Sequence, residues 1–355
     1  MANHPVFRWL LDTAQLWPAP ASISSGHQVT STEHWATGTA SRALSVLPPE
    51  ETAKVLRFIR PQDAKLKLGS YLLKHLAIVR SCGIPWSESC ISVADNGKPC
   101  FNPPENAQEK IVQFNVSHHG TVVVLVGRTG PGARLGIDVV HVDWDKDRRK
   151  VARGGFENWV RVFEDVFSER EVADIVSTFP DTYTLENGTV INLKEVEERG
   201  GSYKVENEKL IVQMPDRTEQ TISTEARLKA RLRRFYTFWS LKEAYIKMTG
   251  EALMAEWLRE LEFRNVRLSQ TSQQLQSTGL WGGIVSGVEV WLRNVKESET
   301  RMEIQAFGED YIISTAVEGD KGESPAAAGR FEPWKVLILE EDVYPYTSKH
   351  EELKD

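Results

Sequence analysis

Residues 225–249, EARLKARLRRFYTFWSLKEAYIKMT, are the part of the chain that most clearly specifies a structure. They are rich in leucine, alanine, lysine and arginine, and Gly250 follows them, which is typical of a long helix and its end. On this helix Trp239, Glu243 and Lys247 recur every four residues and therefore share one face. A Glu–Lys pair is usually plain surface charge, but beside aromatic residues it is also compatible with a site for phosphate and metal.

Helices and strands are predicted on both sides of this segment. A helix is expected to begin at Pro49, and a second one to occupy residues 63–80 before Gly83. A helical stretch is expected at 156–176, and short strands at 7–11, 90–93, 112–116, 121–126, 135–142, 258–268, 285–295, 302–307 and 311–317, with a last apolar run at 334–339. This order of helices and strands predicts an α+β fold of two similar halves.

The predicted boundary between the halves is placed before Ala133, after a Gly-Pro-Gly turn. We therefore expect an N-terminal half, 1–132, and a C-terminal half, 133–355. Residues 177–224 are rich in Thr, Glu, Asn and Gly and are interpreted as an inserted, partly mobile excursion. A flexible joint is expected at about 318–333.

Composition excludes several classes of protein. The 355 residues are 41% hydrophobic and 26% charged, which is typical of a globular chain. The formal net charge of −7 argues against a general nucleic-acid binder. Three cysteines without CxxC spacing argue against a disulfide framework or a structural zinc site. With no signal-peptide core and no long apolar run, we expect a soluble cytoplasmic protein without membrane contacts.

Two apolar strands carry polar residues that could do chemistry. In GIDVVH, alternation places Asp138 and His141 on opposite faces, so the two are not expected to share a metal. A lone carboxylate of this kind is more often a turn or cap group. In FNVSHHG, Ser117 and His118 also point to opposite faces and make a poor nucleophile–base pair. His118 is better suited to binding phosphate.

The turn Asn96-Gly97-Lys98-Pro99 could simply be an Asn-Gly turn with a solvated lysine. Neither the full dinucleotide-binding glycine pattern nor a GxxxxGK phosphate loop occurs in the chain. Kinases and P-loop enzymes are therefore disfavoured as alternatives.

Five sequence pieces together resemble one family, the large single-chain 4′-phosphopantetheinyl transferases. They are GKP (97–99), FNVSH (114–118), GID (136–138), FSEREV (167–172) and WSLKEAYIK (239–247). The resemblance extends over about residues 48–317 without the 177–224 block. It is strongest to the fungal members that serve secondary metabolism and lysine biosynthesis.

The resemblance implies an activity and a fold. The activity is Mg²⁺-dependent transfer of the phosphopantetheine arm of coenzyme A to a serine of an apo acyl or peptidyl carrier protein, with Mn²⁺ as an alternative metal. Such carriers belong to polyketide synthases, non-ribosomal peptide synthetases, fatty acid synthases and aminoadipate reductases; the second product is adenosine 3′,5′-bisphosphate. The fold is two similar α+β halves with the active site in the cleft between them, in a self-sufficient monomer. The alternative is a non-catalytic coenzyme A or carrier-binding module on the same scaffold.

The resemblance also implies roles for individual residues. Asp138 and Glu243 would be the metal carboxylates and, with Lys247, the catalytic residues. Glu243 would take the serine proton and Lys247 would neutralise or protonate the departing phosphate. The cofactor-binding residues would be Lys54, Lys98, Asn115, Ser117, His118, Lys242 and Lys247. Many relatives carry a further acid where this chain has Val140.

The first half of the long helix is also expected to bind a partner. Carrier domains are usually acidic, so docking to this acidic chain needs a local group of positive charges. The helix supplies five, at Arg227, Lys229, Arg231, Arg233 and Arg234. The alternative is a solvated helix face with no measurable role.

Overall fold

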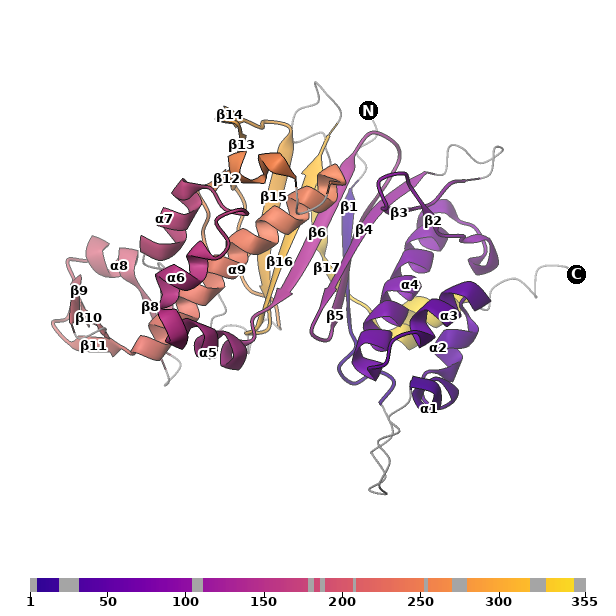
Figure 1. Cartoon of the computed structure of the whole chain (residues 1–355), viewed down its shortest axis with the longest axis horizontal. Coiled ribbons are helices and arrows are strands. Elements are labelled where there is room, and N and C mark those ends of the chain that lie inside the picture. Colours follow the sequence, from indigo (N-terminus) through magenta and orange to yellow (C-terminus); the bar gives the residue numbers. More distant parts are fainter. Residues whose placement is uncertain are drawn as a thin grey trace, which may run out of the picture. The chain divides into compact units, whose positions relative to one another are not determined.

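A computed structural model describes residues 5–18, 32–103, 111–177, 182–185, 189–206, 209–251, 255–269, 280–319 and 330–347 (Figure 1). The chain forms two compact units. The first comprises residues 1–139, 247–251 and 317–355, and the second comprises 140–246 and 252–316. Within the described residues, no helix combines the length and the apolar character needed to cross a membrane.

A four-stranded sheet with helices packed against it forms the first unit. Its strand order is β17-β1-β5-β4, with β1 at Val6–Asp12, β4 at Val112–His119, β5 at Val122–Thr129 and β17 at Phe331–Val336. The long helix α4, Pro61–Cys82, packs on β4 and β5 (Figure 1). The other elements of this unit are α1 (Thr32–Thr37), α2 (Ser41–Ser45), α3 (Pro49–Leu56), η1 (Trp86–Glu88), β2 (Ser92–Val93), β3 (Pro99–Cys100), η4 (Leu339–Val343) and α11 (Tyr344–Thr347).

The local sequence explains why α4 begins and ends where it does. Pro61 occupies the first turn, where a missing N–H costs nothing. Gly83 closes the helix in the left-handed conformation, with φ at 63°, and its N–H donates to the carbonyl of Val79. The buried face carries apolar side chains such as Leu68, Leu72 and Leu76, which join the core of this unit. The predicted helices at 49 and 63–80 are thus confirmed.

The C-terminal segment belongs to the first unit, not to a separate C-terminal half. Strand β17 pairs in parallel with β1, with Val6 opposite Phe331 and Leu10 opposite Val336. The units therefore follow no single cut at 132/133. Of the expected joint at 318–333, residues 331–333 form strand, and residues 320–329 lie outside the described part of the chain.

The second unit is built around α9, Thr224–Thr249, whose first 23 residues lie in it and which confirms the predicted helix at 225–249. Phe235 of α9 lies among Trp159, Phe163 and Phe167, with ring centroids 4.4–5.4 Å away. The other helices are α5 (Trp144–Gly154), α6 (Phe156–Arg161), α7 (Glu169–Ser177) and η3 (Glu256–Glu260). Its strands form the sheet β12-β13-β14, with β12 at Leu261–Arg264, β13 at Glu289–Leu292 and β14 at Val295–Lys296. A further sheet has the order β15-β16-β6, with β15 at Thr300–Phe307, β16 at Tyr311–Glu318 and β6 at Arg134–His141; residues 134–139 of β6 and 317–318 of β16 are assigned to the first unit.

The 177–224 block is more regular than its composition suggested. Its described residues form the hairpin β7-β8 (Thr182–Thr184 and Val190–Asn192), the helix α8 (Leu193–Glu198) and a three-stranded sheet. The strand order of this sheet is β11-β10-β9, with β9 at Ser202–Glu206, β10 at Lys209–Gln213 and β11 at Glu219–Ile222. Buried side chains such as Tyr183, Val196 and Leu210 form a small core, which Ala230 of α9 joins. Tyr203 of β9 packs against this core. The block is therefore a packed subdomain in its described parts; residues 178–181, 186–188 and 207–208 lie outside them.

Candidate functional site

Asp138, Ser117 and Lys247 converge in the first unit. The Asp138 side chain, on β6, is buried, and its Oδ1 accepts hydrogen bonds from Ser117 Oγ at 2.9 Å and from Lys247 Nζ at 2.6 Å. Lys247 Nζ also donates to Ser117 Oγ at 2.9 Å. Burial raises the pKa of the Asp138 carboxyl, and the charge of Lys247 opposes this rise. Three motifs that are far apart in sequence thus share one polar cluster.

Asn115 braces this cluster from the neighbouring strand. It is buried on the same face of β4 as Ser117, and its Oδ1 accepts from the backbone N–H of Ile137 at 3.4 Å. This hydrogen bond holds strand β6 to β4 at the residue that precedes Asp138. Its predicted contact with the cofactor stays a prediction.

His118 lies on the other face of β4, as strand alternation predicts. Phe114 and Val116 of the same strand pack with the core that α4 helps to form, and His118 shares their face. Desolvation and then the charge of Lys247 lower the pKa of His118. Lys67 and Lys74 of α4 contribute in the same direction. His118 therefore faces a group of lysines, two of which sequence reasoning missed.

The turn that carries Lys98 packs on the end of α9. Lys98 Nζ donates to the carbonyl of Met248 at 2.7 Å. Gly250 is left-handed, with φ at 87°, and a Cβ on it would lie 2.3 Å from Asn96 Nδ2 and 3.1 Å from Lys98 Cε. Only glycine satisfies both demands, so Gly250 ends the helix and also makes room for the GKP turn.

Lys54 is exposed on α3, and its charge lowers the pKa of both Lys67 and Lys74. It thus acts on the same two lysines that lower the pKa of His118. Its role near a phosphate stays a prediction.

The predicted phosphate contact of Lys242 is wrong. Its side chain has 0% exposure, and its Nζ is 2.8 Å from Glu171 Oε2. The ammonium also donates to the carbonyls of Leu258 and Leu261. Glu171 itself accepts from the N–H groups of Ser168 and Phe263, so the pair is fully bonded in the interior. Lys242 therefore joins α9 to α7 and β12, and has no surface to offer a ligand.

Glu243 is half-buried on α9, one turn before Lys247. A ready-made cluster of three or more His, Cys, Asp or Glu side chains is absent from the residues that the structure describes. Mg²⁺ does not need one, because it commonly takes one or two carboxylates and completes its shell with phosphate oxygens and water. Each unit supplies one carboxylate of this kind, the buried Asp138 in the first and the half-buried Glu243 in the second. Val140 contributes no third carboxylate.

Most of the charged residues that were predicted to form a docking surface on α9 instead make contacts within the protein. Arg231 donates to the carbonyl of Val176 and lies over the Phe156 ring at 4.1 Å. Arg234 is buried and forms a 2.7 Å ion pair with Asp174. Of the five predicted charges, only Lys229 is exposed. These arginines attach α9 to its neighbours and are not available to steer a partner.

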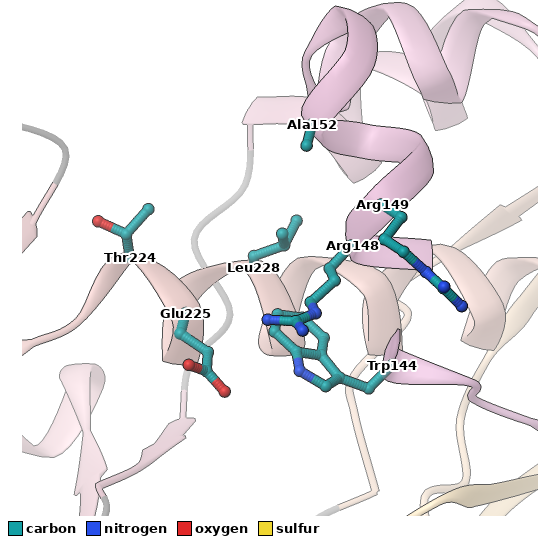
Figure 2. Close-up of a pocket in the computed structure, with 7 residues that line it drawn as sticks. All are labelled: Trp144, Arg148, Arg149, Ala152, Thr224, Glu225 and Leu228. Atoms are coloured by element: carbon teal, nitrogen blue, oxygen red, sulfur yellow. The ribbon is translucent and has the colours of Figure 1, made fainter. Parts of the chain in front are cut away.

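An open pocket of about 370 Å³ lies where α5 meets the beginning of α9 (Figure 2). Trp144, Arg148 and Arg149 line it from α5, and Glu225 and Leu228 from α9. The lining combines apolar side chains, such as Trp144 and Leu228, with the basic Arg148 and Arg149, and the other bases of α5 are exposed as well. Most of the exposed positive charge around this pocket is therefore on α5, with Lys229 on α9.

Comparison with known proteins shows which family this chain resembles. The family model described as 4′-phosphopantetheinyl transferase, N-terminal, matches residues 33–130, and that of the 4′-phosphopantetheinyl transferase superfamily matches residues 197–316. A 4′-phosphopantetheinyl transferase of Aureobasidium melanogenum is 36% identical over 96% of this chain and 97% of its own length. The 4′-phosphopantetheinyl transferase 1 of Fusarium mangiferae is 33% identical over 90% and 88%.

A more distant relative comes from Xenopus laevis. It is named L-aminoadipate-semialdehyde dehydrogenase-phosphopantetheinyl transferase and is 23% identical over 83% of this chain and 77% of its own length. The full-length similarity to the fungal enzymes, together with the Asp138–Ser117–Lys247 cluster, shows that the chain belongs to the 4′-phosphopantetheinyl transferase family.

Proposed function

We propose that this chain transfers the 4′-phosphopantetheine arm of coenzyme A to a serine of an apo carrier protein, releasing adenosine 3′,5′-bisphosphate. The observation that carries the proposal is the cluster in which Lys247 is held by Asp138 and Ser117. It combines a buried carboxylate with a directed cation, which is what a reacting pyrophosphate requires. All the named residues belong to one chain, so we expect a monomer to be active.

The nucleotide phosphates would bind the basic groups of the first unit. Lys98, fixed by Met248, and His118, beside the lysines of α4, would contact phosphate oxygens. Lys54 would add charge from α3. Each charge-assisted contact of this type contributes about 1.5–3 kcal/mol.

The transfer step would use Lys247 and Glu243. Lys247 would stabilise the negative charge that develops on the pyrophosphate and would neutralise or protonate the departing phosphate. Glu243 would accept the proton of the carrier serine, directly or through water. Asp138 and Glu243 would hold Mg²⁺, which when bound neutralises phosphate charge and polarises phosphorus.

A transfer assay tests the proposal. The full chain is mixed with coenzyme A, Mg²⁺ and an apo carrier domain, and the carrier is weighed by intact-mass spectrometry. The carrier domain of an L-aminoadipate-semialdehyde dehydrogenase is one choice, because one relative bears that name. Binding of coenzyme A without any mass gain on several carriers would favour the non-catalytic binding module instead.

Coenzyme A affinity is expected to fall as the pH rises through about 8. Burial and the charge of Arg134 lower the pKa of Lys98 to about 8. Burial and neighbouring lysines lower the pKa of Lys74 to about 8 as well. Above that pH both ammonium groups lose the charge that attracts phosphate. Calorimetric titration at several pH values on either side of 8 measures this loss.

The variant Lys98→Arg is the control, because arginine stays charged in proteins. Its affinity should decline less steeply with pH than that of the wild type, with the remaining slope due to Lys74. The stability of the ligand-free protein is expected to change with pH in the opposite direction. Unfolded Lys98 keeps its proton up to its ordinary pKa of 10.5, so the unfolded state binds more protons above pH 8 and the stability contribution rises with pH there. A pH-independent affinity across this range would contradict the placement of Lys98.

A further inference from the structure

One face of α4 carries two lysines on either side of a tyrosine. Lys67 Nζ lies 4.9 Å and Lys74 Nζ 4.2 Å from the centroid of the Tyr71 ring. Lys74 is only 5% exposed, and no carboxylate of the described chain lies within ion-pair distance of it. The Lys74 ammonium nitrogen keeps some access to solvent, since it is not one of the fully buried polar atoms that lack a hydrogen-bond partner. A cation that is almost buried, keeps one side accessible to solvent and has no anion beside it is energetically unfavourable.

Glu51 is the nearest buried carboxylate, but it is already engaged. Its Oε2 lies 2.8 Å from His75 Nε2, and His75 Nδ1 lies 2.7 Å from Ser89 Oγ. Ser89 donates its only proton to the carbonyl of Trp86 at 2.5 Å. His75 Nδ1 must therefore carry a proton and donate it to Ser89.

The number of protons held by Glu51 and His75 together determines the net charge of this pair. The contact between His75 Nε2 and Glu51 Oε2 also needs one proton, which either group can hold. In both cases the Glu51–His75 pair carries no net charge. The pair therefore adds no net negative charge beside the lysines, although the Glu51 carboxylate acts to raise the pKa of Lys67 and Lys74 against the larger effect of burial. Its neighbour Glu50 is exposed on α3. In the described chain Lys54, Lys67 and Lys74 form no ion pair with a carboxylate.

We propose that Lys74 is a specificity-determining residue for the phosphate monoester of coenzyme A, and that His75 is a positioning residue that keeps Glu51 from neutralising it. This inference rests on the proposed function. A phosphate monoester carries close to two negative charges at neutral pH, whereas the pyrophosphate diesters of the same ligand carry one per phosphorus. A group of three cations, two of which (Lys67 and Lys74) also act on His118, matches the monoester best. The same group should discriminate against coenzyme A that lacks this phosphate.

The variant Lys74→Met tests the role of the lysine. We expect the ratio of kcat/KM for coenzyme A to that for 3′-dephospho-coenzyme A to fall about tenfold or more, which is the loss of one charge-assisted contact. The free variant should unfold at the same or a higher temperature than the wild type, since a desolvated charge has been removed. A lysine with a purely structural role would show the reverse: lower thermal stability and an unchanged ratio.

Lys65→Met is the matched control. Lys65 lies on the same helix, is 6% exposed, and has its pKa lowered by burial alone, without neighbouring charges. It should leave the ratio unchanged. An equal fall of the ratio in both variants would overturn the assignment of Lys74.

The variant His75→Gln tests the positioning role. Glutamine can still donate one hydrogen bond to Glu51 but cannot share its proton, so Glu51 becomes a full negative charge near the lysines. The ratio of kcat/KM for coenzyme A to that for 3′-dephospho-coenzyme A should then fall, although all three lysines are still present. The double variant Glu51→Gln/His75→Gln should restore this ratio. A ratio that stays at the wild-type value in His75→Gln, or that the second substitution does not restore, overturns this role. If wild type binds neither form of coenzyme A, the proposed function fails as well. If it binds both equally, only the monoester site fails.

Discussion

Replacing Asp138 by asparagine should lower the rate of transfer by at least about 10²-fold, a typical effect for removing one preorganised charged group from a reacting centre. Asparagine has nearly the same shape but cannot be a charged ligand for a metal, and it cannot fix the ammonium of Lys247 as an ion pair. The fold should survive, because burial of the Asp138 charge is itself unfavourable. Lys247 loses a partner in this variant, but its side chain is 30% exposed and can be solvated. Single-turnover transfer rates and thermal unfolding measure the two effects.

Asp147→Asn provides the control for this variant. Asp147 is also buried, and its Oδ2 accepts from the hydroxyl of Tyr236 at 2.5 Å, but it belongs to the second unit and to no proposed site. Its replacement should cost stability and leave the transfer rate per folded molecule unchanged. A variant Asp138→Asn with the wild-type rate at ordinary Mg²⁺ concentration would remove Asp138 from the catalytic residues.

Local patterns in the sequence predicted much of the fold. Helix α4 begins at Pro61 and ends before Gly83, and α9 ends before Gly250; such signals act over a few residues and need no knowledge of the tertiary structure. Alternation along β4 likewise separated Ser117, which meets Asp138, from His118, which faces α4. The three-part cluster itself was expected only from the family resemblance.

Pairings over long sequence separations could not be predicted in this way. Strand β17 joins β1 although more than 300 residues separate them, and nothing in either strand specifies the other. The charges of Arg231 and Arg234 looked like a free surface because their partners, Val176 and Asp174, come from another helix or its end. Charge alone does not distinguish a docking surface from an internal bond.

The sequence did contain a signal for Lys242. Phe238 precedes it by four residues and Tyr245 follows it by three, so Lys242 lies on the apolar stripe of α9 and not on the face of Glu243 and Lys247. Both neighbours are buried, as is Lys242. A lysine on such a stripe requires a buried anion, and the FSEREV motif offered two acids, of which Glu171 is the partner. The family resemblance outweighed this periodicity in the prediction.

Lys242→Met should lower the free energy of unfolding by about 3–5 kcal/mol, since breaking a buried ion pair leaves one charge without compensation. Glu171 would remain in the interior with only the N–H groups of Ser168 and Phe263. Burial already raises the pKa of Glu171, and without Lys242 it should rise further. The folded variant would then bind a proton that the unfolded chain releases, so the loss of stability should become smaller as the pH falls. Denaturant titrations at several pH values measure this dependence.

Two further variants separate this structural role from a role in binding. Lys242→Met combined with Glu171→Leu removes both charges, so much of the lost stability should return, because an apolar pair can replace a buried ion pair at little cost. Lys247→Met, five residues further along the same helix, should instead retain most of the stability and lose transfer. If Lys242→Met unfolds like the wild type but binds coenzyme A more weakly, the lysine contacts the nucleotide after all. If the double variant stays as unstable as the single one, the ion pair with Glu171 is not the cause.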